Sequence, residues 1–87
     1  MDFAATPDHH DRVANRNDPL LTALGFRVRQ LREGKRWTQK ALAERADLDR
    51  SYVAGIEAGL RNPSVKAVAR IARGLETTLA DLFQTVS

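Results

Sequence analysis

Apolar residues recur every three or four positions after Pro19, which is the spacing of an α-helix with one buried face. The run closes near Gly34. Its apolar side is formed by Leu20, Leu21, Leu24, Val28 and Leu31. Charged and amide side chains occupy the other sides. This pattern predicts a first helix over residues 20–34, with the five apolar positions facing the core.

Two short helices are predicted next, separated by a turn of about three residues. The hydroxyl of Thr38 is suited to cap the first of them, which stops at Asp47. Asp49 is suited to cap the second over residues 50–58, and Gly59 supplies the left-handed conformation that ends it. The inward positions are Leu42, Ala43 and Ala46 in the first and Val53 and Ile56 in the second.

Two further helices complete the pattern. Ser64 follows the turn at Asn62 and Pro63 and is suited to cap a fourth helix. The apolar face of that helix comprises Val65, Val68, Ile71, Ala72 and Leu75. Thr78, with Asp81 three residues later, resembles a capping box and predicts a last helix. Its inward residues are Leu79, Leu82 and Phe83. The sequence contains no strand pattern and predicts an all-α fold of five short helices.

The second and third predicted helices, joined by their tight turn, constitute a helix-turn-helix. The second helix of this motif can enter a DNA major groove about 12 Å wide. With Val53 and Ile56 facing the core, the opposite side of the third helix carries the small residues Ser51, Ala54, Gly55 and Ala58. A solvated face typically carries Lys and Glu, so this stripe indicates close approach of another molecule, here base edges.

The first turn of the third helix holds the expected base reader, Arg50. Arginine bound bidentately to guanine is the commonest specific contact of recognition helices. The alternative is that Arg50 pairs with Asp47 or another acid on the surface. Ser51 is expected to bind a base or a phosphate. Tyr52 is expected either to stack on the DNA backbone or to fill an edge of the core.

Phosphate contacts are expected from helix N-termini and from the loops that flank the recognition helix. Lys35, Arg36 and Trp37 would extend this surface, although a tryptophan just before a helix is more typical of a hydrophobic staple. The complete set of expected DNA-binding residues is Thr38, Gln39, Lys40, Asp49, Arg50, Ser51, Tyr52, Ala54, Gly55, Arg61 and Asn62.

Glu57 lies beside the core face of a helix that should meet a polyanion, so its carboxylate needs a partner. Arg32 follows the core position Leu31 on the first helix and is the expected partner. We therefore expect a partly buried ion pair that joins the first helix to the third. The alternative is a solvent-exposed Glu57.

Length and charge agree with a small basic domain. The chain has 87 residues, net charge +3, eleven arginines, three lysines and no cysteine. One core is all that such a length supports, and neither a disulfide nor a thiolate zinc site can brace it. Residues 20–87 carry a net charge of +5. Arginine-rich basic domains suit phosphates and planar acceptors, although a solvated charged surface is the alternative.

The first residues differ from the rest of the chain. Residues 1–19 carry a net charge of −2 and have no helical or strand periodicity, so we expect a flexible arm followed by one DNA-binding domain over 20–87. His9 and His10 lack a third ligand, so a solvated tail is a better interpretation than a metal site. No metal and no cofactor is predicted. Docking of the arm on DNA or on a second subunit is left open.

The segment from about Leu24 to Phe83 resembles the Cro/C1-type (XRE) helix-turn-helix family of bacterial and phage regulators. The resemblance is carried by LGFRVRQLR, WTQKALAERADLDRSYVAGIE, GLRNPSVKAVARIARGL and TLADLF. It implies a five-helix, lambda-repressor-like domain, a recognition helix that begins at Arg50 and a phosphate contact from Gln39. It also implies a salt bridge between Arg32 and Glu57.

Two positions depart from the family pattern. Asp47 stands where the family usually has glycine, and aspartate tolerates the left-handed region better than most residues. Gly55 stands where phage repressors can carry a base-contacting side chain. The residues left for direct contact with bases are therefore Arg50, Ser51 and Ala54. The stretch LDRSYVAGIEAGLRNPS is also similar to the controller proteins of restriction-modification systems, small homodimers that regulate their own operons.

The function expected from these features is sequence-specific DNA binding by a homodimeric transcriptional regulator in the cytoplasm. The dimer surface is expected at the last helix or at Phe26. The alternative is an antitoxin whose arm folds on a partner toxin. Without cysteine, and with its histidines confined to the arm, the chain is not expected to be an enzyme. No segment approaches the length of a membrane span.

Overall fold

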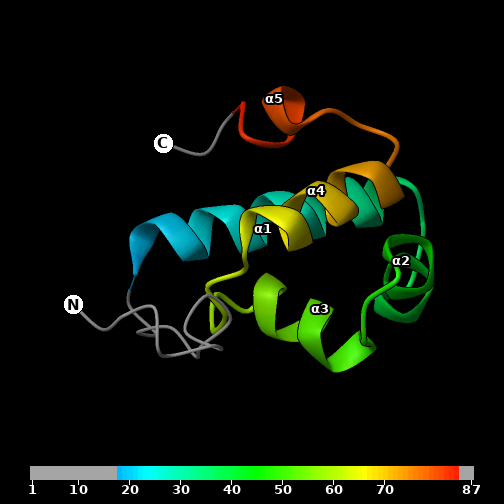
Figure 1. Cartoon of the computed structure of the whole chain (residues 1–87), viewed down its shortest axis with the longest axis horizontal. Coiled ribbons are helices and arrows are strands. Elements are labelled where there is room, and N and C mark those ends of the chain that lie inside the picture. Colours follow the sequence, from blue (N-terminus) through cyan, green and yellow to red (C-terminus); the bar gives the residue numbers. More distant parts are fainter. Residues whose placement is uncertain (1–17, 85–87) are drawn as a thin grey trace.

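Five helices make up the described part of this computed structural model, residues 18–84 (Figure 1). They are α1 (Pro19–Gly34), α2 (Gln39–Ala46), α3 (Arg50–Glu57), α4 (Val65–Gly74) and α5 (Leu79–Leu82). The all-helical fold class and all five predicted helices are confirmed. Almost all of the arm expected over residues 1–19 lies outside the described residues, as do His9 and His10, so those expectations stay predictions.

Side-chain caps explain where most of these helices begin. Each capping oxygen accepts a hydrogen bond from a backbone N–H of the first turn, which would otherwise lack a partner. The caps are Asp18 on Leu20 at 2.9 Å, Thr38 on Ala41 at 3.0 Å, Ser64 on Ala67 at 3.1 Å and Thr78 on Asp81 at 3.0 Å. Asp49 occupies the predicted cap position of α3, but its side chain makes no capping hydrogen bond.

The core lies between α1, α2, α3 and α4, whose buried apolar residues form one cluster. Helix α2 packs against both α3 and α4, α3 packs against α1, and α5 packs against α4. Figure 1 shows α3 and α5 on opposite sides of the band formed by α1 and α4. The largest fully buried side chains are Val28, Leu42, Val53, Ile56, Ile71, Leu75 and Leu82. Every one of them was expected to face inward.

Four apolar residues expected in the core are instead exposed. Leu20 is 56% exposed, Val65 78%, Leu79 41% and Phe83 39%, so the inward placement predicted for them is wrong. Leu20 and Val65 lie in the first turns of α1 and α4, and Leu79 begins the short α5. Periodicity identifies the apolar side of a helix, but it does not tell how far along that side the neighbouring helix extends.

Arg27, a residue of α1, holds α5 in place through hydrogen bonds to the backbone of that helix. Its Nη2 donates to the carbonyl oxygen of Asp81 at 2.8 Å, and its Nε donates to that of Leu82 at 3.3 Å. These carbonyls belong to the last turn of α5, where backbone acceptors have no partner within the helix. A helix of only four residues is therefore fastened by a cation from a distant part of the sequence.

Candidate nucleic-acid interface

Helices α2 and α3 form a helix-turn-helix whose turn is closed by backbone hydrogen bonds. Asp47 adopts the predicted left-handed conformation, with φ 58° and ψ 49°. The N–H of Leu48 then donates to the carbonyl of Ala43 at 2.9 Å, and the Leu48 side chain packs against the core. This arrangement ends α2 in the manner of a left-handed cap. Aspartate thus takes the place in the turn that glycine usually occupies.

Glu57 is the centre of a buried hydrogen-bond network on the inner side of α3. Its side chain is 3% exposed, and Arg32 Nε lies 2.7 Å from Glu57 Oε2. Arg32 Nη2 donates to Glu57 Oε1 at 3.0 Å, which makes the pair bidentate. Arg32 Nη1 donates to the carbonyl of Trp37 at 2.6 Å. Glu57 is therefore buried and paired with Arg32, and the alternative of a solvent-exposed carboxylate is wrong.

The electrostatics of this pair follow from its geometry. The hydrogen bond to Glu57 and the negative charge of that carboxylate raise the pKa of Arg32 above its ordinary value, against the opposing effect of burial. A raised pKa means that folding is favoured by the charged guanidinium at every pH below the ordinary arginine value. Arg32 therefore stays charged, and its contribution to stability does not change across the neutral range.

Gln39, at the start of α2, joins the same network. Its Nε2 donates to Glu57 Oε1 at 3.0 Å, so the last residue of α3 is linked to the first residue of α2. A carboxamide nitrogen carries two N–H donors, and this bond uses one of them. Gln39 was expected from the sequence to contact DNA, but its bond to Glu57 was not expected. The bond orients the residue that is expected to contact phosphate.

The first two residues of α3 are exposed. Arg50 and Ser51 both lie at the surface. Within residues 18–84, no hydrogen bond or ion pair joins Arg50 to another side chain, and the alternative pairing with Asp47 is not seen there. Asp49, just before this turn, likewise makes no capping bond. As far as residues 18–84 show, the start of the predicted recognition helix therefore presents polar side chains that are not bonded to other side chains.

The outer side of α3 carries the small residues as expected, but another side chain lies across it. Ser51 and Ala58 are exposed, and Ala54 and Gly55 are partly buried. A Cβ atom built on Gly55 would lie 2.8 Å from Cγ of Arg61. The space at Gly55 is therefore occupied by an arginine of the same molecule, which the sequence pattern did not reveal.

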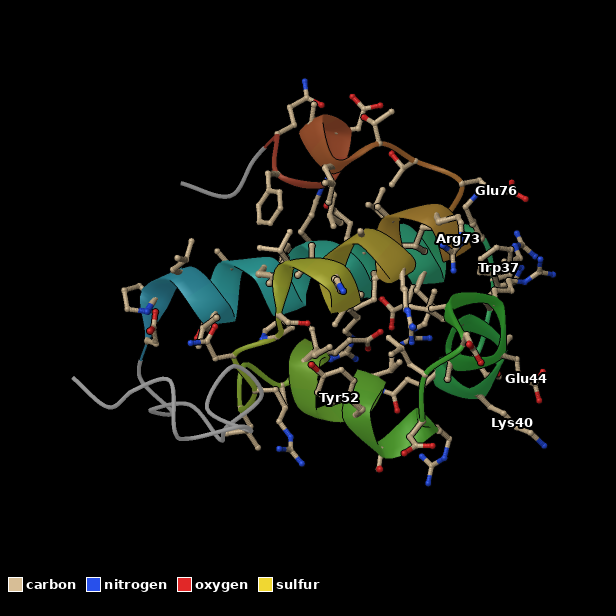
Figure 2. All side chains as sticks on the ribbon, viewed as in Figure 1. Trp37, Lys40, Glu44, Tyr52, Arg73 and Glu76 are labelled. Carbon is tan, nitrogen blue, oxygen red and sulfur yellow. The ribbon has the colours of Figure 1, made fainter. Side chains whose placement is uncertain are left out.

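Tyr52 lies at the border between the core and the outer side of α3. Its ring packs partly against the core cluster, as one of the two interpretations of this residue expected. The guanidinium carbon of Arg61 lies 5.8 Å from the centroid of the ring. Figure 2 shows Tyr52 on α3, whereas Lys40 points away from the body of the molecule from α2. Tyr52 thus connects the buried and exposed sides of the motif.

The remaining predicted contacts lie in different surroundings. Thr38 uses its hydroxyl as a helix cap. Asn62 is exposed and is one of the residues that line an apolar groove, as is Leu20. Trp37 packs partly against the core, with the Arg45 guanidinium carbon 4.0 Å from its ring centroid, which favours the structural interpretation of this residue.

Among residues 18–84, no group of three or more histidine, aspartate or glutamate side chains is arranged to hold a metal ion. No helix in the same range is long and apolar enough to span a membrane.

Comparisons with known proteins agree with this architecture. A family model described as "Helix-turn-helix" matches residues 28–82. The control protein C.MunI from Mycoplasma sp is 38% identical over 63 residues, which cover 71% of this chain and 85% of that protein. The control protein C.BamHI from Bacillus amyloliquefaciens is 39% identical over 60 residues, covering 68% and 74% of the two chains.

Solved structures of restriction-modification controller proteins are also similar. C.AhdI from Aeromonas hydrophila is 41% identical with a TM-score of 0.71, covering 72% of this chain and 96% of that one. C.Esp1396I, solved as a tetramer in complex with its natural 35-base-pair operator, is 36% identical with a TM-score of 0.73. That match covers 77% of this chain and 88% of the C.Esp1396I chain.

Proposed function

The chain belongs to the Cro/C1-type (XRE) helix-turn-helix family of DNA-binding transcriptional regulators, and we propose that it binds operator half-sites as a homodimer and regulates its own operon. The observation that carries this proposal is the contrast between the two ends of α3. The C-terminal end is anchored by the buried Arg32–Glu57 pair, and the N-terminal end presents Arg50 and Ser51 at the surface. A helix held in this way can present its first turn to base edges.

Phosphate contacts are proposed around this helix. Gln39 and Lys40 lie at the N-terminus of α2, where backbone N–H groups point outward and attract anions. Arg61 follows α3 and lies across its outer side. Contacts of this kind place a protein on the duplex without reading its sequence. We assign base readout to Arg50 and Ser51, and orientation on the backbone to Gln39, Lys40 and Arg61.

The relatives support a role as a controller protein. C.MunI, C.BamHI, C.AhdI and C.Esp1396I are control or controller proteins, and C.Esp1396I binds its own operator. A phage immunity repressor is also similar, at 40% identity over 52 residues. These proteins favour a regulator over the antitoxin alternative, and no observation favours the antitoxin. We place the protein in the cytoplasm, where its DNA target lies.

The dimer surface is proposed at α5 and not at Phe26. An apolar groove of about 210 Å³ is lined mainly by side chains from α1, α4 and α5, including the exposed Leu20, Val65, Leu79 and Phe83. Phe26, although 65% exposed, lies among Arg29, Gln30 and Glu33. Clustered exposed apolar side chains mark interaction surfaces, and the occupant proposed here is a second copy related by a two-fold axis.

One titration tests the proposed DNA binding. The full chain is titrated against duplex DNA from upstream of its own coding sequence and against a random duplex, each at two salt concentrations. We expect tighter binding to the upstream duplex and a steep loss of affinity with salt, because phosphate contacts release counterions. Equal affinity for both duplexes would contradict autoregulation.

A single substitution tests the proposed dimer. Val65→Asp places a charge in the groove and should shift the protein from dimer to monomer in sedimentation equilibrium, while its helix content is retained. Phe26→Asp is the matched control, because it places the same charge at the other exposed apolar site. If Phe26→Asp dissociates the dimer and Val65→Asp does not, the interface lies at Phe26 on α1 and not in the groove at α5.

A further inference from the structure

The outer side of α3 contains a space that only a glycine leaves open. A Cβ atom built on Gly55 would lie 2.8 Å from Cγ, 3.6 Å from Nε and 3.7 Å from Cδ of Arg61. Carbon atoms in favourable contact are about 3.5 to 4.0 Å apart, so the first distance is too short for a methyl group. Because these atoms follow one another along the same side chain, Arg61 runs over Gly55.

The path of the chain after α3 explains why Arg61 returns over the helix. The N–H of Gly59 donates to the carbonyl of Ile56 at 3.0 Å, and the N–H of Leu60 donates to that of Gly55 at 2.9 Å. Together with the left-handed φ of 75° at Gly59, these bonds form a Schellman motif that reverses the chain. Arg61 is the next residue and lies beside the helix that has just ended.

Tyr52 supplies the second wall of this site. Residues 52 and 55 are three apart on α3, so their side chains share one side of the helix. The Arg61 guanidinium carbon lies 5.8 Å from the Tyr52 ring centroid, within the range of a cation–π contact. Arg61 is also only partly exposed. Its aliphatic part therefore lies over Gly55 while its charged end lies near an aromatic ring.

We propose that Gly55 and Tyr52 form a seat for Arg61 and that this seat sets the direction in which the guanidinium meets DNA. The inference rests on the proposed DNA-binding function and assigns Gly55 as a positioning residue for Arg61. A glycine inside a helix lowers helix stability relative to alanine. Here it gives room for an arginine that is already oriented before DNA arrives, which reduces the entropy lost on binding.

The energetics of the seat make a specific variant informative. Gly55→Ala adds one methyl group, and the atoms that it meets belong to the side chain of Arg61 and not to the backbone. We therefore expect the fold to remain intact, with an equal or higher unfolding midpoint, while Arg61 loses its position. Gly34→Ala is the matched control, because Gly34 ends α1 and a Cβ atom there meets nothing within 4 Å.

A double-mutant cycle on the full chain tests the proposal. The probes are the upstream duplex and a random duplex. We expect Arg61→Ala to weaken binding about tenfold, Gly55→Ala to weaken it at least threefold, and Gly34→Ala to leave it unchanged. Gly55→Ala should have no further effect when Arg61 is already alanine. Equal effects of Gly55→Ala in both backgrounds, or no effect in either, would overturn the seat.

A spectroscopic measurement without DNA separates this inference from the proposed function. The Nε–H resonance of Arg61 should be displaced by the Tyr52 ring, and both Gly55→Ala and Tyr52→Leu should move it, whereas Gly34→Ala should not. An unchanged resonance in Gly55→Ala would overturn the seat even if the wild-type protein binds DNA. Failure of the wild-type chain to bind any duplex would instead overturn the proposed function, and with it the role assigned to the seat.

Discussion

A glycine lies at each of the two sides of α3, and the two glycines have different effects. On the inner side, Gly25 of α1 faces the carbonyl oxygens of Ile56 and Glu57, and a Cβ atom there would lie 2.6 Å from the oxygen of Glu57. On the outer side, Gly55 faces the side chain of Arg61. Backbone carbonyls of a packed helix cannot move aside, whereas an arginine side chain can. The first glycine therefore sets where the helix lies, and the second sets where a side chain points.

Charge differs between the two ends of α3. The C-terminal end holds the Arg32–Glu57 pair, with Glu57 accepting hydrogen bonds from both Arg32 and Gln39. The N-terminal end begins with Arg50, which is exposed. A charge that is buried and bonded contributes to the position of a helix, and an exposed one is available to a partner. Substitutions at the two ends should therefore separate stability from DNA recognition.

The largest effect is expected from breaking the inner anchor. Glu57→Ala would leave the Arg32 guanidinium buried without its carboxylate, at a cost of about 3 to 5 kcal/mol in the free energy of unfolding. Urea denaturation followed by circular dichroism measures this change. Arg29→Ala is the control, since Arg29 is 60% exposed and its ion pair with Glu33 lies at the surface, and should cost at most about 0.5 kcal/mol. Similar losses in both variants would show that the buried pair is not an anchor.

The two glycines should respond to alanine with opposite signs. Gly25→Ala forces a methyl group against the carbonyls of α3 and should lower the free energy of unfolding by about 1 to 3 kcal/mol. Gly55→Ala should raise it by up to about 1 kcal/mol, because alanine is the better helix former. Urea midpoints of the two variants give the comparison directly. A loss of stability in Gly55→Ala comparable to that in Gly25→Ala would mean that Arg61 cannot move aside.

On the proposed DNA-binding surface, specificity and general affinity should separate. Arg50→Ala should relax discrimination at one base pair per half-site by about 1 to 3 kcal/mol. Lys40→Ala should weaken binding to all duplexes alike and reduce the salt slope by about 1. Fluorescence anisotropy with a set of single-base operator variants measures both. Lys40 is preferred to Gln39 for this purpose because Gln39 also bonds to Glu57. A uniform loss in both variants would remove Arg50 from base readout.

The smallest effect is expected at the turn that joins the two helices. Asp47 holds a left-handed conformation that glycine adopts without strain, so Asp47→Gly should stabilise the fold by up to about 1 kcal/mol. Asp47→Ala is the control, because it removes the same charge but keeps a Cβ atom, which disfavours positive φ. Thermal unfolding of the two variants distinguishes strain from charge. If alanine stabilises as much as glycine does, the charge and not the backbone is the cause.

Local sequence signals predicted the helices well because their causes are local. Thr38 and Ser64 cap helices through bonds to residues only three positions away, and Asp47 turns the chain by its own conformation. Arg32 and Glu57 were also paired from sequence, because a carboxylate beside a core face needs a cation and Arg32 was placed beside the facing core position. The extent of the core was not predictable in this way, as the exposure of Leu20 and Val65 shows.

The candidate interface was predicted only in part. The sequence indicated that the outer side of α3 is slim, and Arg50 and Ser51 do lie at the surface. The sequence did not indicate that Arg61 covers Gly55 or that Gln39 bonds to Glu57. Side-chain directions of this kind depend on the relative positions of loops and helix ends in space. Residue spacing along the chain does not give those positions.

By itself, the sequence determined five helices, a helix-turn-helix and a buried pair that joins α1 to α3, since caps, periodicity and charge act over short distances or through simple chemistry. The tertiary structure decided which exposed apolar residues gather in the groove at α5 and what occupies the space at Gly55. These features depend on where helices end against one another and on the path of the chain after α3. For that reason the glycine in the middle of α3 could be noticed from sequence, but its neighbour Arg61 could be recognised only in three dimensions.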